Sequence, residues 1–281
     1  MSVAAPPSPF KGLAAFEDTE LDALLFCGRE REREVVVANL LASRLTVLYG
    51  ASGVGKSSLL RAAVAHSLRR EHDAAVVVFA SWAGDPRAGL GVAIDEAVGI
   101  ESSGTLSERL GAVGEVYVIL DQFEEYFLYH EHDPFADELA EAIGQPGLRA
   151  NFLLGLREDA LAKLDAFKGR IPNLFANYLR LDHLDRAGAK AAILGPVERW
   201  NELTGESIRV EPELVEAVLD EVAAGKVDVG QAGRGGVEAD DERIEAPYLQ
   251  LVLERLWEAE RERHSDVLRL ATLQELGGAG Q

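Results

Sequence analysis

The feature that most restricts how this chain can fold is a glycine-rich run at residues 50–57, which reads Gly-Ala-Ser-Gly-Val-Gly-Lys-Ser. It matches the pattern G-x-x-x-x-G-K-[ST] at every fixed position. An apolar run, Leu45 to Tyr49, comes directly before it, and a helical stretch over 57–70 follows. A buried strand, a tight glycine turn and a helix in this order predict a loop whose backbone N–H groups bind phosphate.

Each residue type in this run has a chemical reason. Glycine lets the backbone turn tightly and approach phosphate oxygens. Lys56 supplies a point charge for the β- and γ-phosphates, and the Ser57 hydroxyl is a hard oxygen ligand for Mg²⁺. Ser58 either shares contact with the α-phosphate or caps the helix. The predicted nucleotide-binding residues of this segment are Gly50, Ser52, Gly53, Val54, Gly55, Lys56, Ser57 and Ser58.

Strand-like and helical stretches alternate through the first two thirds of the chain. The strand-like runs are continuous and apolar, as expected for strands buried on both faces of a parallel sheet. They lie at residues 45–49, 75–80, 116–120 and 152–156, with a weaker run at 178–181. Helical stretches lie between them at 57–70, 86–98 and 135–143. This alternation predicts an α/β fold with a mainly parallel sheet.

The strand signal stops after about residue 182, and three helical stretches follow at 186–200, 213–224 and 247–263. In the last of them, apolar residues fall at helical spacing and form one stripe. We therefore expect an N-terminal arm and helix over 1–44, an α/β core over 45–182 and a helical subdomain over 183–281. Residues 225–245 are predicted to be a surface loop, and the chain is expected to be a fragment of a longer polypeptide.

Composition excludes several classes of protein. The chain is 47% hydrophobic, enough for a substantial core, and its single cysteine, Cys27, excludes an internal disulfide framework. The net charge of −20 argues against a nucleic acid partner for the module as a whole.

The N-terminus lacks the basic and apolar regions of a secretory signal, and no apolar stretch is long enough to span a bilayer. We expect a cytoplasmic protein without membrane contact.

A second polar feature follows the apolar run at 116–120, where the sequence continues Asp121-Gln122-Phe123-Glu124-Glu125. The carboxyl ends of parallel strands meet at one edge of a sheet, which is where ligands bind in open α/β folds. Asp121 is therefore predicted to hold Mg²⁺ opposite Ser57. Glu124 and Glu125 are the candidates for orienting or deprotonating water, with Glu125 weakly favoured, and the alternative for both is a capping or surface role.

An arginine also follows the fourth strand-like run, in Leu156-Arg157-Glu158-Asp159. An arginine at the end of a buried strand can reach a γ-phosphate and respond to its loss. The alternative for Arg157 is an ion pair with Glu158, with Asp159 or with a helix end.

With these residues in view, the chain resembles a STAND NTPase (signal-transduction ATPase with numerous domains) of the bacterial novel STAND group. The likeness covers most of the chain. It includes the phosphate loop, Asp121–Glu125 and Arg157–Asp159. The other matching segments are Pro9–Leu13, Phe16–Glu17, Leu25–Glu30, Ala192–Pro196, Ala246–Gln250 and Leu256–Trp257.

The resemblance implies a five-stranded P-loop NTPase sheet in the order 5-1-4-3-2, flanked by helices and followed by a helical lid. It implies ATP or ADP as the nucleotide, with Gly28 and Arg29 enclosing adenine and phosphates and Pro247 approaching the base. It also implies a regulated switch in defence or signal transduction, assembling with protein partners or with copies of itself. Effector and sensor domains would lie outside this chain.

Two departures from the family pattern leave the function open. Position 122 is Gln where many related ATPases place a catalytic Glu, and no winged helix, effector or repeat sensor is recognisable. The leading hypothesis is a switch with weak, regulated ATP hydrolysis to ADP and phosphate. The alternatives are a turnover ATPase or kinase, and a nucleotide-held scaffold with negligible hydrolysis.

Two weaker features of the sequence carry no function. Residues 130–133 are interpreted as a surface loop rather than a metal site, and Cys27 as a small buried residue.

Overall fold

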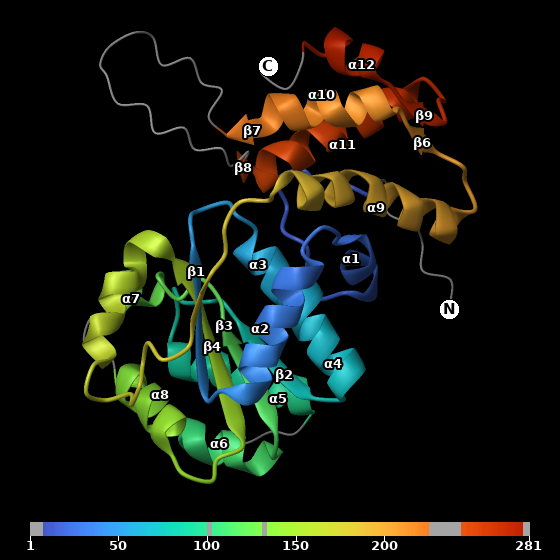
Figure 1. Ribbon diagram of the computed structural model, residues 1–281. Coiled ribbons are helices and arrows are strands. Elements are labelled where there is room, and N and C mark those ends of the chain that lie inside the picture. Colours follow the sequence, from blue (N-terminus) through green and yellow to red (C-terminus); the bar gives the residue numbers. More distant parts are fainter. Residues whose placement is uncertain (1–7, 100–102, 131–133, 225–242, 278–281) are drawn as a thin grey trace, which may run out of the picture. The chain divides into compact units, whose positions relative to one another are not determined.

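The computed structural model describes residues 8–99, 103–130, 134–224 and 243–277 (Figure 1). By their contacts the residues divide into two compact units. The helical unit comprises Met1–Glu30, Gly53–Gly55 and Asp182–Gln281, and the sheet unit comprises Arg31–Ser52 and Lys56–Leu181. The boundaries expected from the sequence at residues 44 and 182 remain a prediction about independent domains.

The sheet unit is built on five parallel strands in the order β2-β3-β4-β1-β5, which is the predicted order 5-1-4-3-2 seen from the other edge. The strands are β1 (Leu45–Gly50), β2 (Ala75–Phe79), β3 (Val116–Leu120), β4 (Ala150–Arg157) and β5 (Tyr178–Arg180). Every residue of β3 is buried, as expected for an apolar strand covered on both faces. β4 lies between β1 and β3, so the turns that follow these strands share one edge of the sheet.

Helices flank the sheet on both faces (Figure 1). They are α2 (Glu30–Ala42), α3 (Lys56–Ser58), α4 (His66–His72), α5 (Pro86–Val98), α6 (Leu106–Val113), α7 (Tyr126–Tyr129) and α8 (Phe135–Gly144), with a 3-10 segment at Glu158–Phe167. One core packs alternate residues of β1, β3 and β4 against α5, α6 and α8. α5 has the predicted bounds because the Asp85 side chain caps its first N–H groups and left-handed Gly99 ends it.

The helix after the phosphate loop differs from expectation. The sequence predicted one regular helix over 57–70, but the structure has α3, then a π-helical segment, Leu59–Ala65, and then α4. Wider π turns are rare and concentrate at functional sites. Nothing in the composition of this stretch distinguishes a π turn from an ordinary helical turn.

The helical unit has its own core. Its helices are α1 (Glu20–Leu25), α9 (Arg186–Thr204), α10 (Pro212–Val222), α11 (Ala246–Glu262) and α12 (Leu270–Glu275). Two short strand pairs join them: β6 (Arg209–Val210) with β9 (Val267–Leu268), and β7 (Ala223–Ala224) with β8 (Arg243–Ile244). The predicted stripe of α11 is buried, at Leu249, Val252, Leu253, Leu256 and Trp257. Residues 225–242 of the predicted surface loop lie outside the described residues.

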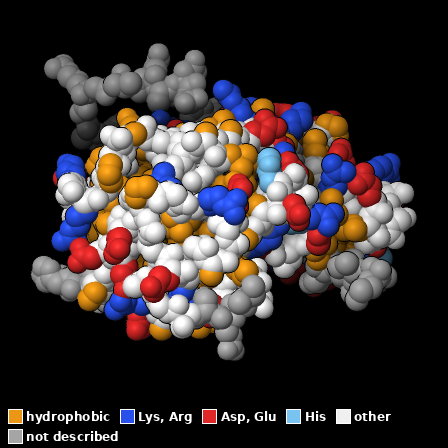
Figure 2. All heavy atoms as spheres, turned by 90° about the horizontal axis from the view of Figure 1, so that it is seen from below, with side chains coloured by type: hydrophobic (Ala, Val, Ile, Leu, Met, Phe, Trp, Pro, Cys, Tyr) orange, Lys and Arg blue, Asp and Glu red, His pale blue; other side chains and the backbone are white. Residues whose placement is uncertain are grey.

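On the face drawn in Figure 2, acidic and basic side chains lie interspersed with apolar ones. None of the described helices is both long and apolar enough to cross a membrane. In the described part of the chain, no cluster of three or more His, Cys, Asp or Glu side chains could hold a metal ion. His130 lies near the Trp82 carbonyl oxygen, and residues 131–133 fall outside the described ranges.

Candidate functional site

The phosphate loop joins β1 to α3, as the sequence predicts. Gly53 and Gly55 have φ angles of +79° and +92°, in the left-handed region that side chains disfavour. The Val54 side chain is buried, whereas Ser52 is exposed. The glycine pattern therefore corresponds to a real backbone requirement.

Lys56 stands at the end of this loop, and its ammonium group folds back over it. Nζ donates hydrogen bonds to the carbonyl oxygens of Gly50, at 2.9 Å, and of Ala51, at 2.8 Å. Burial lowers the pKa of Lys56, and the negative charges of Glu124 and Asp121 act in the opposite direction. The lysine thus lies in the field of two carboxylates at this edge of the sheet.

Asp121 follows β3 and is 1% exposed. Its backbone is held on both sides, since Asp121 N donates to Phe79 O and the Trp82 indole Nε1 donates to Asp121 O, each at 2.8 Å. One carboxylate oxygen, Oδ1, accepts the Gln122 N–H at 2.9 Å. The other oxygen, Oδ2, is buried and has no hydrogen-bond partner among the described residues.

A cation lies near this unpartnered oxygen: Nη2 of Arg61 is 3.5 Å from Oδ2 of Asp121. Burial raises the pKa of the Asp121 carboxyl, while a hydrogen bond with Ser57 and the charge of Arg61 act to lower it. A buried carboxylate oxygen in need of a partner, joined to a serine hydroxyl, is a set of hard oxygen donors of the kind that Mg²⁺ prefers. The residues therefore fit the predicted metal.

Gly155 of β4 allows these groups to meet. A Cβ atom at this position would lie 2.8 Å from Leu60 Cδ1 and 3.4 Å from Asp121 Oδ1. The Gly155 carbonyl also accepts the Phe123 N–H at 2.8 Å, which anchors the turn after Asp121 to β4. The absence of a side chain at Gly155 thus makes room for both the π-helical segment and the Asp121 carboxylate.

The remaining predicted catalytic residues lie around the ends of β3 and β4. Oε2 of Glu124 accepts the backbone N–H of Arg157 at 3.1 Å. The Arg157 guanidinium pairs with Asp159, with Nη2 2.7 Å from Oδ2 and Nε 3.1 Å from Oδ1. Glu125 caps α7 through its backbone position, without a side-chain capping bond. The roles of these three residues in catalysis stay predictions.

Predicted nucleotide contacts outside the loop belong to the helical unit. Arg29 is buried, and its Nη2 donates to Val54 O at 3.0 Å and Asp182 O at 2.8 Å. Pro247 stands in the first turn of α11, and a Cβ on Gly53 would lie 3.4 Å from its Cγ. Gly28 has φ +89°, and a Cβ there would clash with Gly188 O. Their contact with a nucleotide remains a prediction.

Sequence reasoning missed three residues of the site: Arg61, Trp82 and Gly155. Trp82 was interpreted only as a core aromatic residue, and it is indeed fully buried. Its bond to the Asp121 carbonyl, like the positions of Arg61 and Gly155, depends on which strands are neighbours in the sheet.

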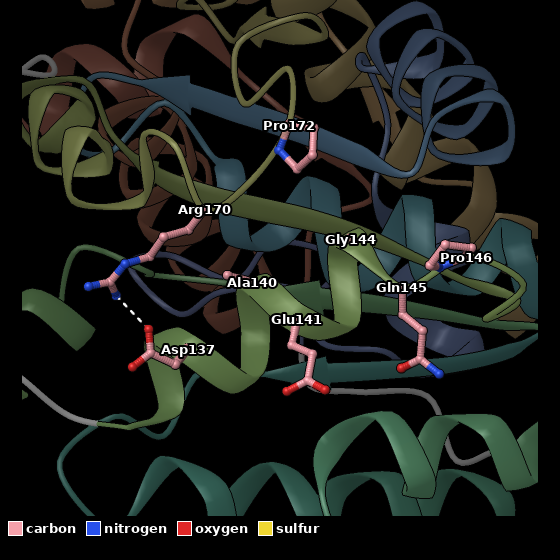
Figure 3. Close-up of a pocket in the computed structure, with 8 residues that line it drawn as sticks. All are labelled: Asp137, Ala140, Glu141, Gly144, Gln145, Pro146, Arg170 and Pro172. Atoms are coloured by element: carbon pink, nitrogen blue, oxygen red, sulfur yellow. Dashed lines mark ion pairs between the residues drawn. The ribbon is translucent and has the colours of Figure 1, made fainter.

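A surface depression of the sheet unit lies elsewhere. The residues that line it come from α8, from the turn after α8 and from the segment before β5. An ion pair joins two of them, Asp137 and Arg170, at 2.8 Å (Figure 3). None of its lining residues belongs to the phosphate loop or to the turn after β3. It is therefore not part of the candidate site.

The strand order, the loop after β1 and the acid after β3 define a P-loop NTPase fold. The model of the family "Novel STAND NTPase 1" matches residues 9–281, and the chain belongs to this family. The predicted family likeness is thus confirmed. No curated protein sequence matches the chain.

Similar solved structures support the fold. The chain is similar to the ORC2 protein of Aeropyrum pernix in its ADPNP-ADP complexes (TM-score 0.61, 16% identity, covering 95% of this chain and 69% of that one). It is also similar to a Walker-type ATPase of Pyrococcus abyssi (TM-score 0.58, 15% identity, covering 94% of this chain and 75% of that one). A third similar structure is Drosophila ORC bound to DNA (TM-score 0.58, 13% identity, covering 89% of this chain and 60% of that one). At these identities the likeness concerns the fold alone.

Proposed function

We propose that this chain binds an adenine nucleotide with Mg²⁺ at the edge of the sheet unit and acts as a slowly hydrolysing signalling switch. The observation that carries the proposal is the meeting of Lys56, Ser57 and the buried, partly unpartnered carboxylate of Asp121. In this arrangement Lys56 balances phosphate charge, and the loop N–H groups bind phosphate oxygens. Ser57 and Asp121 would hold Mg²⁺, which supplies charge neutralisation at the β- and γ-phosphates.

Slow hydrolysis is supported by the state of the groups that could activate water. Position 122 is a glutamine with a left-handed backbone (φ +53°). Glu124 accepts the Arg157 N–H, so one of its oxygens is engaged. Water activation by Glu124 would then fall to its other carboxylate oxygen, Oε1, and Glu125 is the alternative base.

The switch itself is assigned to Arg157. A γ-phosphate would compete with Asp159 for the guanidinium, because both present oxygens suited to its planar fork. ATP and ADP then favour different positions of Arg157. A nucleotide that binds one conformation of the protein more tightly than another shifts the population toward that conformation. We assign ATP rather than GTP on the family likeness, and place this switch in defence or signal transduction, with protein partners or further copies of the chain.

Two other functions would give different rates of phosphate release. A turnover ATPase or kinase would release or transfer phosphate at the ordinary enzyme rate of about 10 s⁻¹. A nucleotide-held scaffold would bind and scarcely hydrolyse, which Gln122 would favour. One similar structure is described as bound to DNA, but the net charge of −20 favours no such partner here.

Equilibrium binding of fluorescent ATP and ADP analogues tests the proposal. Lys56→Ala should abolish binding, because the loop loses its phosphate charge. Lys168→Ala is the matched control, since Lys168 is exposed and pairs with Asp165 elsewhere. Undiminished affinity in Lys56→Ala would refute the site. Phosphate release without a partner well above about 1 s⁻¹ would favour the turnover enzyme.

A further inference from the structure

Arg61 is a charged residue of the site to which the proposed function gives no role. It lies in the π-helical segment, one helical turn after Ser57. Its Nη2 is 3.5 Å from Oδ2 of Asp121, and the two side chains are 22% and 1% exposed. The cation therefore reaches a carboxylate that is almost completely removed from water.

The pairing is loose in geometry. Oδ2 of Asp121 has no hydrogen-bond partner in the described part of the chain, so its contact with Arg61 is an ion pair without a hydrogen bond. A bidentate guanidinium–carboxylate pair would be shorter and stronger. Even so, a buried carboxylate needs a compensating charge, and Arg61 provides it at the oxygen that is left for Mg²⁺.

The other nearby cation is directed elsewhere. Lys56 Nζ donates to the carbonyl oxygens of Gly50 and Ala51, although its charge acts on Asp121 from a distance. The acidic groups that act on Lys56 are Glu124, Asp121 and Asp159, with Arg157 opposing them. Arg61 is thus the cation in ion-pair contact with Asp121.

The fold holds Arg61 in this place. Leu60 and Ala62, its neighbours in the π-helical segment, are fully buried, and Leu60 lies against Gly155. The helix therefore cannot rotate away from β4 without exposing apolar surface. Packing of its neighbours therefore helps to keep Arg61 beside Asp121.

We propose that Arg61 is a built-in counter-ion of Asp121 that stabilises the site without metal and competes electrostatically with Mg²⁺. It would thereby set the Mg²⁺ concentration at which nucleotide binding is strengthened. The inference rests on the proposed nucleotide site. Like charges that face one carboxylate repel each other strongly in a partly buried setting, so removing the guanidinium makes the carboxylate more available to the metal.

The test measures the affinity for a fluorescent ADP analogue while free Mg²⁺ is titrated. Arg61→Met keeps the length of the side chain and removes its charge. We expect the half-saturating Mg²⁺ concentration to fall at least tenfold, because the guanidinium lies 3.5 Å from the carboxylate and only partial exposure to water screens its charge. Arg70→Met is the matched control, because Arg70 is an exposed arginine further along the same helical run, and should leave that concentration unchanged.

Thermal unfolding in EDTA gives a second readout. Arg61→Met should lower the midpoint relative to wild type, because Asp121 loses its counter-ion, and saturating Mg²⁺ with ADP should reduce this deficit. If the methionine variant does not fold, Arg61→Gln is used with the same expectations. A half-saturating Mg²⁺ concentration that stays constant or rises overturns the inference, and wild type without Mg²⁺-dependent nucleotide binding would instead overturn the proposed function.

Discussion

Arg157 at the end of β4 is paired through two nitrogens with the carboxylate of Asp159, two residues later. Both side chains are substantially exposed, at 48% and 65%. Exposed pairs of this kind contribute at most about 1 kcal/mol. A phosphate group can therefore compete with Asp159 for the guanidinium.

If Arg157 senses the γ-phosphate, Asp159→Asn should favour ATP. Releasing the guanidinium should raise the ratio of ATP affinity to ADP affinity about threefold, within the range of an exposed ion pair. Arg157→Ala should lower the ratio of ATP affinity to ADP affinity, because the γ-phosphate loses its contact with the guanidinium. Asp165→Asn serves as control, because Asp165 pairs with Lys168 in the same 3-10 segment. Equal ratios in wild type and Arg157→Ala would remove the sensor role.

Gly155→Ala should disturb both stability and metal-dependent binding. The added methyl group would lie 2.8 Å from Leu60 Cδ1 and 3.4 Å from Asp121 Oδ1, and overpacking of a core costs about 1–3 kcal/mol. Urea unfolding should report this loss, and Mg²⁺-dependent nucleotide affinity should fall with it. A smaller side chain in Gly155→Ala/Leu60→Val should recover part of the loss.

The control for this substitution is Gly111→Ala in α6. Its added Cβ would meet only Leu148 Cδ1, at 3.9 Å, and alanine favours a helix over glycine by about 1 kcal/mol. This variant should be as stable as wild type or more so. Destabilisation of both variants to the same extent would mean that the close contact at Gly155 is not the cause.

How far the sequence predicts this site depends on whether a residue acts through its neighbours in the chain or across the sheet. The phosphate loop and Asp121 were found because strand, turn and residue type are contiguous. Arg61 and Gly155 meet Asp121 only because β4 lies between β1 and β3. The strand order was predicted from the family likeness. The spacing of residues along the sequence does not show which side chains meet across neighbouring strands.

The fold shows the same division. The predicted strands were confirmed at 45–49, 116–120 and 152–156 within longer or equal elements. α6 was missed, although Thr105 and Glu108 form a capping box whose pattern is visible in the sequence. The π turn has no such signal, since its residues are ordinary helix formers.

Gln122→Gly should stabilise the protein. Gln122 has φ +53°, and a side chain in the left-handed region costs about 1–2 kcal/mol that glycine avoids. We expect the free energy of unfolding to rise by about 1 kcal/mol, less than the full strain because glycine has more freedom in the unfolded chain. Gln145→Gly, at a position with φ −71°, should instead be neutral or destabilising. A loss of stability in Gln122→Gly would show that the glutamine side chain compensates for its backbone.

The thiol of Cys27 should react slowly in the native protein. Burial, and then the charge of Glu30, raise the pKa of this thiol to about 11 from 9.0. Raising a thiol pKa lowers the thiolate fraction at any pH below it, here by about 100-fold for two units, and the thiolate is the reactive form. At pH 8, labelling with a disulfide reagent should therefore be at least that much slower than in urea. Because Cys27 is the single cysteine, comparable rates in both conditions would show that the native site is open.

Glu260 should be a main contributor to the stability of the helical unit. Its side chain is completely buried in α11, where it accepts the Thr272 hydroxyl and lies 3.3 Å from Nη1 of Arg269. These partners come from the segment around α12, so the carboxylate joins that segment to α11. Removing the carboxylate takes this acceptor from the buried Thr272 hydroxyl and breaks an ion pair with Arg269, which is 42% exposed, and together these changes cost about 1–3 kcal/mol. Glu260→Ala should approach that loss, and Glu260→Gln should lose less because the amide oxygen still accepts a hydrogen bond.

Urea unfolding followed by tryptophan emission measures this loss, since Trp200 and Trp257 lie in the same core. Glu258→Ala is the matched control: Glu258 is exposed on the same helix, and surface substitutions usually stay within about 0.5 kcal/mol of wild type. If Glu260→Ala and Glu258→Ala unfold at the same urea concentration, the buried carboxylate does not hold α12 in place. If Glu260→Gln is as unstable as Glu260→Ala, the negative charge facing Arg269 contributes the stability, and the hydrogen bond from Thr272 does not.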